Sequence, residues 1–316
     1  MNRKTFDQQM EHYYQLINQT DTDPATLYLQ GLAPSGRRSM RSLLTTAVGI
    51  LGFEDDLENI PWQILEFKHL AKIRSELIIQ GKSANTTNLT LSALRGVLKA
   101  CLSLGLISAD KWMILLGIRP VRGKKLPSGR SLSKKEVRAI YRICKQDRSL
   151  KGKRDLAILS MMLTTGMRRS ETVNLQVSDY NTRNGEVIVV AGKGSKQRKL
   201  YIGKESRQLI RPWVQARSKE KGCLFNPILN AKGIVNRPMT PQALYDVVRS
   251  RSEAAHIGFC KPHDLRRTFV TRLLEAGVDL NTVRQLAGHS SVQTTVKYDL
   301  RDEQSRRIAM RQLSLI

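Results

Sequence analysis

The chain has 316 residues, a length that predicts two domains. Its 53 Lys and Arg against 27 Asp and Glu give a formal charge of +26, which indicates a polyanionic partner rather than a merely soluble basic protein. No apolar run is long enough for a bilayer, no apolar segment follows the first charged residues, and the four cysteines form no CxxC pair. We therefore expect no membrane span, no secretory signal, no metal and a cytoplasmic, nucleoid-associated protein.

Residues 1–118 are predicted to form a small helical domain. Apolar residues recur at helical spacing over 39–52, over 62–79 after Pro61, and over 88–104. These helices also display lysines and arginines, which either contact nucleic acid or form a solvated face.

The charge is unevenly distributed along the chain. Residues 1–120 hold 13 basic and 11 acidic residues, whereas residues 121–316 hold 40 and 16. The second region therefore carries +24 of the +26 and should supply most of the attraction for phosphate.

Residues 119–132 are predicted to be an extended basic linker, because Pro and Gly interrupt helices and like charges repel one another. The segment is either a plain spacer or a strand that follows a phosphate backbone. On the second interpretation, its DNA-binding residues are Arg122, Lys124, Lys125 and Arg130.

A second, mostly helical domain is predicted from residue 133 to residue 300, beginning at a Ser133–Glu136 capping box. Two strands separated by a basic, glycine-bearing loop, 191–197, read as an antiparallel hairpin. The expected strands are 186–190 and 198–202, and the expected helices are 133–147, 152–165, 204–219, 241–256, 263–276 and 279–287. The tail, 301–316, is predicted to be an amphipathic helix.

Several side chains suited to phosphodiester chemistry occur in this second domain. Cleavage without a metal needs fixed cations for the developing charge, an acid for the leaving oxygen and a positioned nucleophile. Arginine suits the first task because its planar fork can hold two phosphate oxygens. Arg168 follows a glycine that is typical of a helix end, and His263 and Arg266 share one face of a predicted helix.

The loop around Lys193 contains glycines and a lysine, as a nucleotide-binding phosphate loop does, but the Gly-x-x-x-x-Gly-Lys-Ser/Thr order is missing and the loop joins two strands. We therefore reject nucleotide binding there. Downstream, His289 is followed nine residues later by Tyr298. A tyrosine is a poor nucleophile unless nearby cations stabilise its phenolate. Taken alone, residues of these kinds more often have a structural role than a catalytic one.

Over roughly residues 130–300 the ordered series resembles the tyrosine recombinases, the phage-integrase family. The motifs that carry the resemblance are Gly-Met-Arg-Arg-Ser-Glu at 166–171, Gly-Lys-Gly at 192–194, His-Asp-Leu-Arg at 263–266, Leu-Ala-Gly-His-Ser at 286–290 and Thr-Thr-Val-Lys-Tyr at 294–298. The family pattern usually has an apolar residue where this chain has Arg169.

The resemblance implies a role for each motif residue. Arg168 and Arg266 would grip the scissile phosphate, Lys193 would be the general acid, and His263 a proton-transfer group. His289 would hydrogen-bond a phosphate oxygen, Tyr298 would be the nucleophile, and Glu171 would support Arg168. Lys196 is the alternative general acid, and we expect Lys196 and Arg198 to contact DNA.

The resemblance also implies a mainly α fold with a small antiparallel β-sheet, in which the tyrosine-recombinase catalytic fold forms part of a two-domain, C-shaped DNA clamp. Its function would be site-specific recombination through a 3′-phosphotyrosyl intermediate, without a cofactor. The partners would be duplex DNA with inverted-repeat core sites and three further copies in a homotetramer on two sites. The tail helix would dock on a neighbouring protomer or fold back on its own domain. The alternatives are a type IB topoisomerase or telomere resolvase, or a DNA-binding protein with an inactive site.

Overall fold

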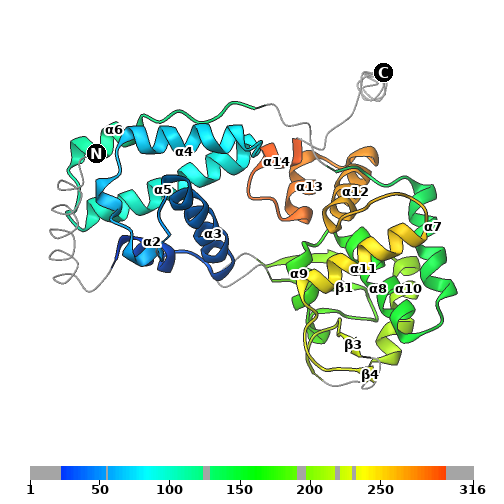
Figure 1. Ribbon diagram of the computed structural model, residues 1–316. Coiled ribbons are helices and arrows are strands. Elements are labelled where there is room, and N and C mark those ends of the chain that lie inside the picture. The colour runs from blue at the N-terminus through cyan, green and yellow to red at the C-terminus, as the bar shows by residue number, and fades with distance from the viewer. Residues whose placement is uncertain are drawn as a thin grey trace, which may run out of the picture. The chain divides into compact units, whose positions relative to one another are not determined.

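The chain divides into two compact units, Met1–Lys125 and Leu126–Ile316, named unit 1 and unit 2 below. A computed structural model of the protein (Figure 1) describes residues 23–54, 56–123, 129–190, 197–217, 221–229 and 233–296. The predicted tail helix, 301–316, and the linker residues Lys124 and Lys125 lie outside the described residues. Within the described ranges, no helix has both the length and the apolar character to span a membrane.

Unit 1 is helical throughout its described part. Its helices are α2 (Pro24–Gln30), α3 (Pro34–Leu51), α4 (Phe67–Ile79), α5 (Ala84–Ser103) and α6 (Ala109–Leu116), with 3-10 turns η1 (Leu57–Asn59) and η2 (Trp62–Ile64) between α3 and α4. The fully buried Trp62 anchors this core, and its Nε1 donates to the carbonyl of Leu57 at 3.0 Å. The core is therefore an apolar one formed by the inner faces of these helices.

Helix α4 begins later than the apolar pattern predicts. We expect a helix from Trp62, but Trp62–Ile64 is a 3-10 turn, and α4 starts at Phe67. Glu66 has an extended backbone and caps the helix, since its N–H donates to His69 Nδ1 at 3.0 Å. Local capping thus overrides the apolar spacing, which continues through the break.

Three side chains of unit 1 hold the beginning of the linker. Asn88 on α5 clamps Val121, donating to its carbonyl at 3.0 Å and accepting from its N–H at 2.7 Å. Arg95 donates to the carbonyl of Ile118 at 2.6 Å, and Arg74 donates to that of Arg119 at 3.0 Å. The chain up to Val121 is therefore an integral part of unit 1.

Unit 2 combines helices with two short antiparallel hairpins. Its helices are α7 (Lys134–Gln146), α8 (Leu150–Thr165), α9 (Arg169–Asn174), α10 (Lys204–Ala216), α11 (Pro241–Ala254), α12 (Pro262–Glu275), α13 (Leu280–Ala287) and α14 (Val292–Val296), and a 3-10 turn, η3 (Val177–Asp179), follows α9. Its strands are β1 (Glu186–Val189), β2 (Arg198–Tyr201), β3 (Ile228–Leu229) and β4 (Gly233–Ile234).

Helix α8 forms the centre of unit 2, because most of its residues are buried and it packs against α7, α10 and α12 (Figure 1). The β1–β2 hairpin has Glu186 opposite Tyr201 and Val189 opposite Arg198. This register turns Val187, Val189 and Leu200 into the core. The expectation of a mainly α fold with small antiparallel sheets is confirmed.

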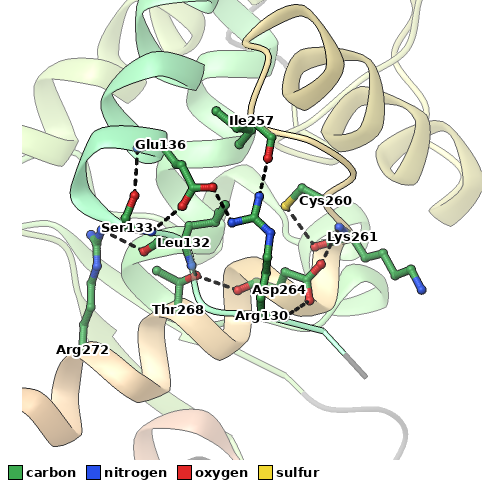
Figure 2. A network of polar contacts seen from close by, with 10 residues as sticks. All are labelled: Arg130, Leu132, Ser133, Glu136, Ile257, Cys260, Lys261, Asp264, Thr268 and Arg272. Atoms are coloured by element: carbon green, nitrogen blue, oxygen red, sulfur yellow. Dashed lines mark hydrogen bonds and ion pairs between the residues drawn. The ribbon is translucent and has the colours of Figure 1, made fainter. Parts of the chain in front are cut away.

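The end of the linker is held by unit 2 in a network of polar contacts (Figure 2). The guanidinium of Arg130 pairs with Glu136 on α7 and donates to the carbonyl of Ile257 at 2.5 Å. The backbone N–H of Arg130 donates to Asp264 Oδ1 on α12 at 3.1 Å. Arg130 thereby ties α7, the segment after α11 and the start of α12 together.

Candidate active site

Arg168 is presented by the sharp turn that joins α8 to α9. Helix α8 ends at Gly166, whose φ of +60° favours glycine, and a Cβ there would lie 2.2 Å from Phe269 Cδ1. Arg168 then takes the N-cap position of α9, where its N–H donates to Glu171 Oε2 at 2.8 Å. Its Nη1 donates to Glu171 Oε1 at 2.9 Å. The Arg168 side chain nevertheless remains 44% exposed, so it is held and still accessible.

Glu171 is the buried carboxylate that joins two arginines. Besides Arg168, it accepts from Arg198 on β2, with Nη2 at 2.7 Å from Oε2 and Nη1 at 3.1 Å from Oε1. Burial opposes its ionisation, but the hydrogen bonds from Arg198 and Arg168 outweigh burial and lower the pKa of Glu171. An ionised carboxylate at this position fixes both guanidinium groups.

Helix α12 contributes Arg266 and His263 from adjacent turns. Arg266 is only 3% exposed, and its Nη1 donates to the carbonyl of Gly166 at 2.7 Å. His263 lies at the exposed start of the same helix. Partial desolvation, followed by the positive charge of Arg266, lowers the pKa of His263. The ring is therefore neutral at neutral pH and able to accept a proton.

His289 follows the end of α13 and is buried against α14. Gly288 closes α13 with a φ of +66°, and its carbonyl accepts from Arg168 Nη2 at 2.6 Å. His289 Nδ1 lies 2.9 Å from the hydroxyl of Thr295. Burial, then the charges of Arg266 and Arg168, lower the pKa of His289 to about 4. The ring is therefore neutral at neutral pH, and its Nδ1 is engaged with the Thr295 hydroxyl.

Three of these residues lie on a pocket of about 290 Å³. Arg168, His263 and Arg266 line it together, along with Met167, Arg169, Tyr245, Lys261 and Pro262. Arg198 and His289 line a neighbouring pocket formed by β2, α13 and the residues after α13. Guanidinium groups, two neutral imidazoles and a fixed carboxylate are thus concentrated in one region, which suits the binding of an oxyanion rather than an apolar ligand.

The predicted site residues fall into three groups. The structure brings together Arg168, Glu171, His263, Arg266 and His289. Lys193, Lys196 and Tyr298 lie outside the described residues, so their predicted roles stay predictions. Arg122 is exposed in unit 1, while Arg130 and Arg198 have the intramolecular partners given above, and the predicted DNA contacts of all three also stay predictions.

Two features of this site were not predicted from the sequence. Arg198 was assigned to DNA contact, yet it is the second arginine on Glu171, 27 residues away along the chain. The sequence predicts no separate role for Thr295, which is completely buried with its hydroxyl 2.9 Å from His289 Nδ1. Among the described residues, no group of three or more His, Cys, Asp and Glu side chains is placed to hold a metal ion.

Sequence comparison places the chain among known proteins. The model of the phage integrase family matches residues 130–305. Tyrosine recombinase XerD of Pseudomonas aeruginosa is 36% identical over 221 residues, which is 69% of this chain and 72% of that protein. Tyrosine recombinase XerC of Azotobacter vinelandii is 31% identical over 241 residues, which is 75% of this chain and 76% of that protein.

Solved structures show the same fold at lower sequence identity. The Tn1549 transposon integrase, in complex with transposon right end DNA, has a TM-score of 0.67 at 18% identity and covers 92% of this chain and 99% of that chain. The XerH site-specific recombinase bound to its difH substrate has a TM-score of 0.64 at 24% identity, covering 87% and 78%. Together with the family match, these comparisons confirm the resemblance: the chain belongs to the phage integrase family and is a tyrosine recombinase, an enzyme that cleaves and rejoins DNA at specific sites.

Proposed function

We propose that Tyr298 is the nucleophile of a two-step strand transfer. Its hydroxyl oxygen attacks a scissile phosphate, forms a 3′-phosphotyrosyl bond and releases a 5′-hydroxyl. A 5′-hydroxyl from a second duplex then attacks that bond, rejoins the strand and restores the tyrosine. The covalent bond keeps the energy of the broken phosphodiester, so each step exchanges one ester for another.

The observation that supports this proposal best is the way the two arginines are held. Arg168 donates to the carbonyl of Gly288 and pairs with Glu171, and Arg266 donates to the carbonyl of Gly166. Both guanidinium groups also line one pocket. Cations that are fixed before the substrate arrives stabilise the developing negative charge without reorganising during the reaction. We assign Arg168 and Arg266 to the two non-bridging oxygens of the scissile phosphate.

The remaining roles concern protons. We assign His289 as a hydrogen-bond donor to a phosphate oxygen through Nε2, with Thr295 setting the tautomer. His263 accepts the proton of the nucleophile, which its lowered pKa permits at neutral pH. Lys193 donates a proton to the leaving 5′-oxygen, and Lys196 is the alternative. Glu171 positions Arg168 and Arg198.

The proposal extends to assembly and to the parts of the chain. Residues 1–118 bind the core DNA site, the linker 119–132 follows the backbone, 133–300 is the catalytic domain, and 301–316 docks on a neighbouring protomer. Together the domains clamp the duplex, and four protomers act on two inverted-repeat core sites of a mobile element or replicon. Such an enzyme works on cytoplasmic DNA at the nucleoid.

A nicked suicide duplex tests the nucleophile. Cleavage beside the nick releases a short fragment, so the covalent protein–DNA adduct accumulates. We expect the wild-type chain to form the adduct, Tyr298→Phe to bind the same DNA without forming it, and peptide mapping to find the DNA on Tyr298. Adduct formation by Tyr298→Phe at the wild-type level contradicts the assignment.

The general acid needs a separate experiment. A 5′-bridging phosphorothiolate leaves as a thiolate, which needs no proton from the enzyme. Lys193→Ala should therefore cleave ordinary DNA slowly and phosphorothiolate DNA at close to the wild-type rate. Rescue of Lys196→Ala instead transfers the role to Lys196. Equal slowing on both substrates shows that the lysine merely binds phosphate.

A further inference from the structure

The pocket that contains the proposed phosphate-binding arginines has further lining residues without an assigned role. Besides Arg168, His263 and Arg266, the lining includes Arg169, Tyr245 and Lys261. The pocket volume of about 290 Å³ is several times the roughly 30 Å³ share of one water molecule. It therefore has room for more than one five-atom phosphate group.

Two of these further lining residues, Arg169 and Lys261, are cationic. Arg169 is exposed at the first position of α9, directly after Arg168, and Lys261 is exposed just before α12. The described lining residues of this pocket include no carboxylate that would neutralise these two charges. Since Arg168 and Arg266 already serve one phosphate in the proposed function, two further cations fit a second one.

Lys261 is held in place from its backbone. Its N–H donates to Asp264 Oδ2 at 2.8 Å, and the same carboxylate accepts from the backbone of Arg130. Arg130 in turn holds the carbonyl of Ile257, so the segment from Ile257 to Lys261 is tied at both ends (Figure 2). Figure 2 shows the Lys261 side chain extending away from this network. The backbone is fixed, while the ammonium group is directed outward.

Aromatic rings support the ammonium group. Lys261 Nζ lies 5.4 Å from the centroid of the Phe259 ring, within the range of a cation–π contact. Phe259 meets Tyr245 of α11 at a centroid distance of 6.4 Å and an interplanar angle of 62°. The contacts with these aromatic rings orient the Lys261 ammonium group without neutralising its charge. Tyr245 also lines the pocket, where a sugar can pack against its ring.

We propose that Arg169, Tyr245 and Lys261 form a second backbone subsite, which binds the phosphate and sugar adjacent to the scissile phosphate. The pocket then holds two consecutive linkages of one strand. Holding the neighbouring linkage fixes the direction of the strand and so aligns the scissile bond with its nucleophile. The subsite rests on the proposed function, because it is defined relative to the phosphate that Arg168 and Arg266 bind.

The subsite is tested by a double-mutant cycle, in which each protein variant is combined with each modified DNA. Nicked suicide duplexes are prepared with one neutral methylphosphonate at each of the phosphates flanking the scissile position in turn. Single-turnover cleavage is measured with saturating wild-type chain, Lys261→Met and Arg169→Leu. Lys145→Met and Arg249→Leu, which replace exposed cations on α7 and α11, are the matched controls.

We expect Lys261→Met and Arg169→Leu each to slow cleavage of ordinary DNA about tenfold, as the loss of a charged hydrogen bond implies. When the methylphosphonate replaces the phosphate that the subsite binds, each variant should cleave within about twofold of the wild-type chain on the same DNA. The neutral linkage has already removed the contact that the substitution would remove. With a methylphosphonate at any other position, the two variants should still cleave about tenfold more slowly than the wild-type chain. The control variants should cleave every duplex at the wild-type rate.

Equal losses at every methylphosphonate position, or no loss on ordinary DNA, overturn the subsite. Thermal unfolding of each variant shows that a loss does not reflect misfolding. The wild-type chain separates the two proposals. If it forms no adduct on unmodified DNA, the proposed function fails. If it forms the adduct but the cycle shows no coupling, the subsite alone fails.

Discussion

The two units differ in where they keep their charges. Within the described residues, every buried charged side chain belongs to unit 2: Arg154, Asp155, Glu171, Arg217, Asp264 and Arg266. The buried polar side chains described in unit 1 are Thr87 and Thr90. Its arginines act from exposed or half-buried positions, as when Arg74 and Arg95 donate to the carbonyls of Arg119 and Ile118. Unit 1 is thus a conventional apolar helical core, whereas unit 2 has buried ions.

This difference separates binding from chemistry. Burying an ion pair carries a desolvation penalty that its mutual attraction often fails to exceed, so stability alone does not explain such pairs. They can hold charged groups in one geometry, as Glu171 does for Arg168 and Arg198. We therefore expect substitutions of Glu171 and Arg266 to impair cleavage more than DNA affinity. Substitutions of exposed cations away from the active-site pocket should do the reverse.

Removing the shared carboxylate should have the largest effect. Glu171→Ala leaves Arg168 and Arg198 without their carboxylate and should destabilise the chain by about 3–5 kcal/mol. It should also slow cleavage by about 10²–10³-fold, because Arg168, the proposed phosphate-binding guanidinium, is no longer fixed. Denaturant unfolding and single-turnover cleavage measure the two effects.

Glu253→Ala is the matched control, since Glu253 pairs with Arg249 on the exposed face of α11. An exposed pair contributes at most about 1 kcal/mol, and its loss should leave cleavage unchanged. Similar results for Glu171→Ala and Glu253→Ala would remove the distinction between buried and exposed charges.

Gly288→Ala should be the next most damaging change. Its φ of +66° strains any other residue, and the added Cβ would lie 2.7 Å from Arg198 Nη1. Gly277→Ala is the control, because its φ is +82° but no atom lies within 4 Å of the added Cβ. We expect Gly277→Ala to destabilise the chain by about 1–2 kcal/mol from backbone strain alone. Gly288→Ala should destabilise the chain more than Gly277→Ala does and should also slow cleavage. If the two variants slow cleavage equally, the predicted clash with Arg198 is contradicted.

The buried His289 should make stability depend on pH. Its folded pKa of about 4 lies below its ordinary value, so between those two values the unfolded chain binds a proton that the folded chain does not. Stability should therefore fall as the pH decreases through this window, by up to about 1.4 kcal/mol per pH unit from this residue. Urea unfolding at about pH 7 and about pH 5 should show a smaller difference for His289→Gln than for the wild-type chain.

Substitutions at the two ends of the linker should have the smallest effect. It should appear in the salt dependence of DNA binding. Arg122 is exposed, whereas Arg130 is held by Glu136 and Ile257. Arg122→Ala should reduce the magnitude of the log–log salt slope by about 0.9, the value for one phosphate contact on duplex DNA. Arg130→Ala should keep the slope and lower thermal stability. A reduced slope for Arg130→Ala would show that this residue leaves its network to bind DNA.

The sequence predicts best what depends on short spacing. His263 and Arg266 are three residues apart, so helical periodicity alone predicts that they share a face, and both line one pocket. The β1–β2 hairpin is equally local. By contrast, β3 and β4 have two residues each, too few for a recognisable alternation.

Long-range pairing could not be predicted from the sequence. The contacts of Arg130 with Asp264 and Ile257 span 134 and 127 residues, and the contact of Arg198 with Glu171 spans 27. A single sequence shows that these residues are charged but does not show which of them meet. Exposed and internally paired arginines therefore look alike, and both were assigned to DNA.

The central claim, that the fixed arginines of the active-site pocket serve the chemical step, is tested most directly by Arg266→Lys. Lysine keeps the charge but loses the planar fork that holds two oxygens. DNA affinity and the single-turnover rate of adduct formation are measured on the same suicide duplex. We predict affinity within about threefold of the wild type and adduct formation at least about a hundredfold slower. Affinity and rate falling by the same factor, or an unchanged rate, would contradict the account.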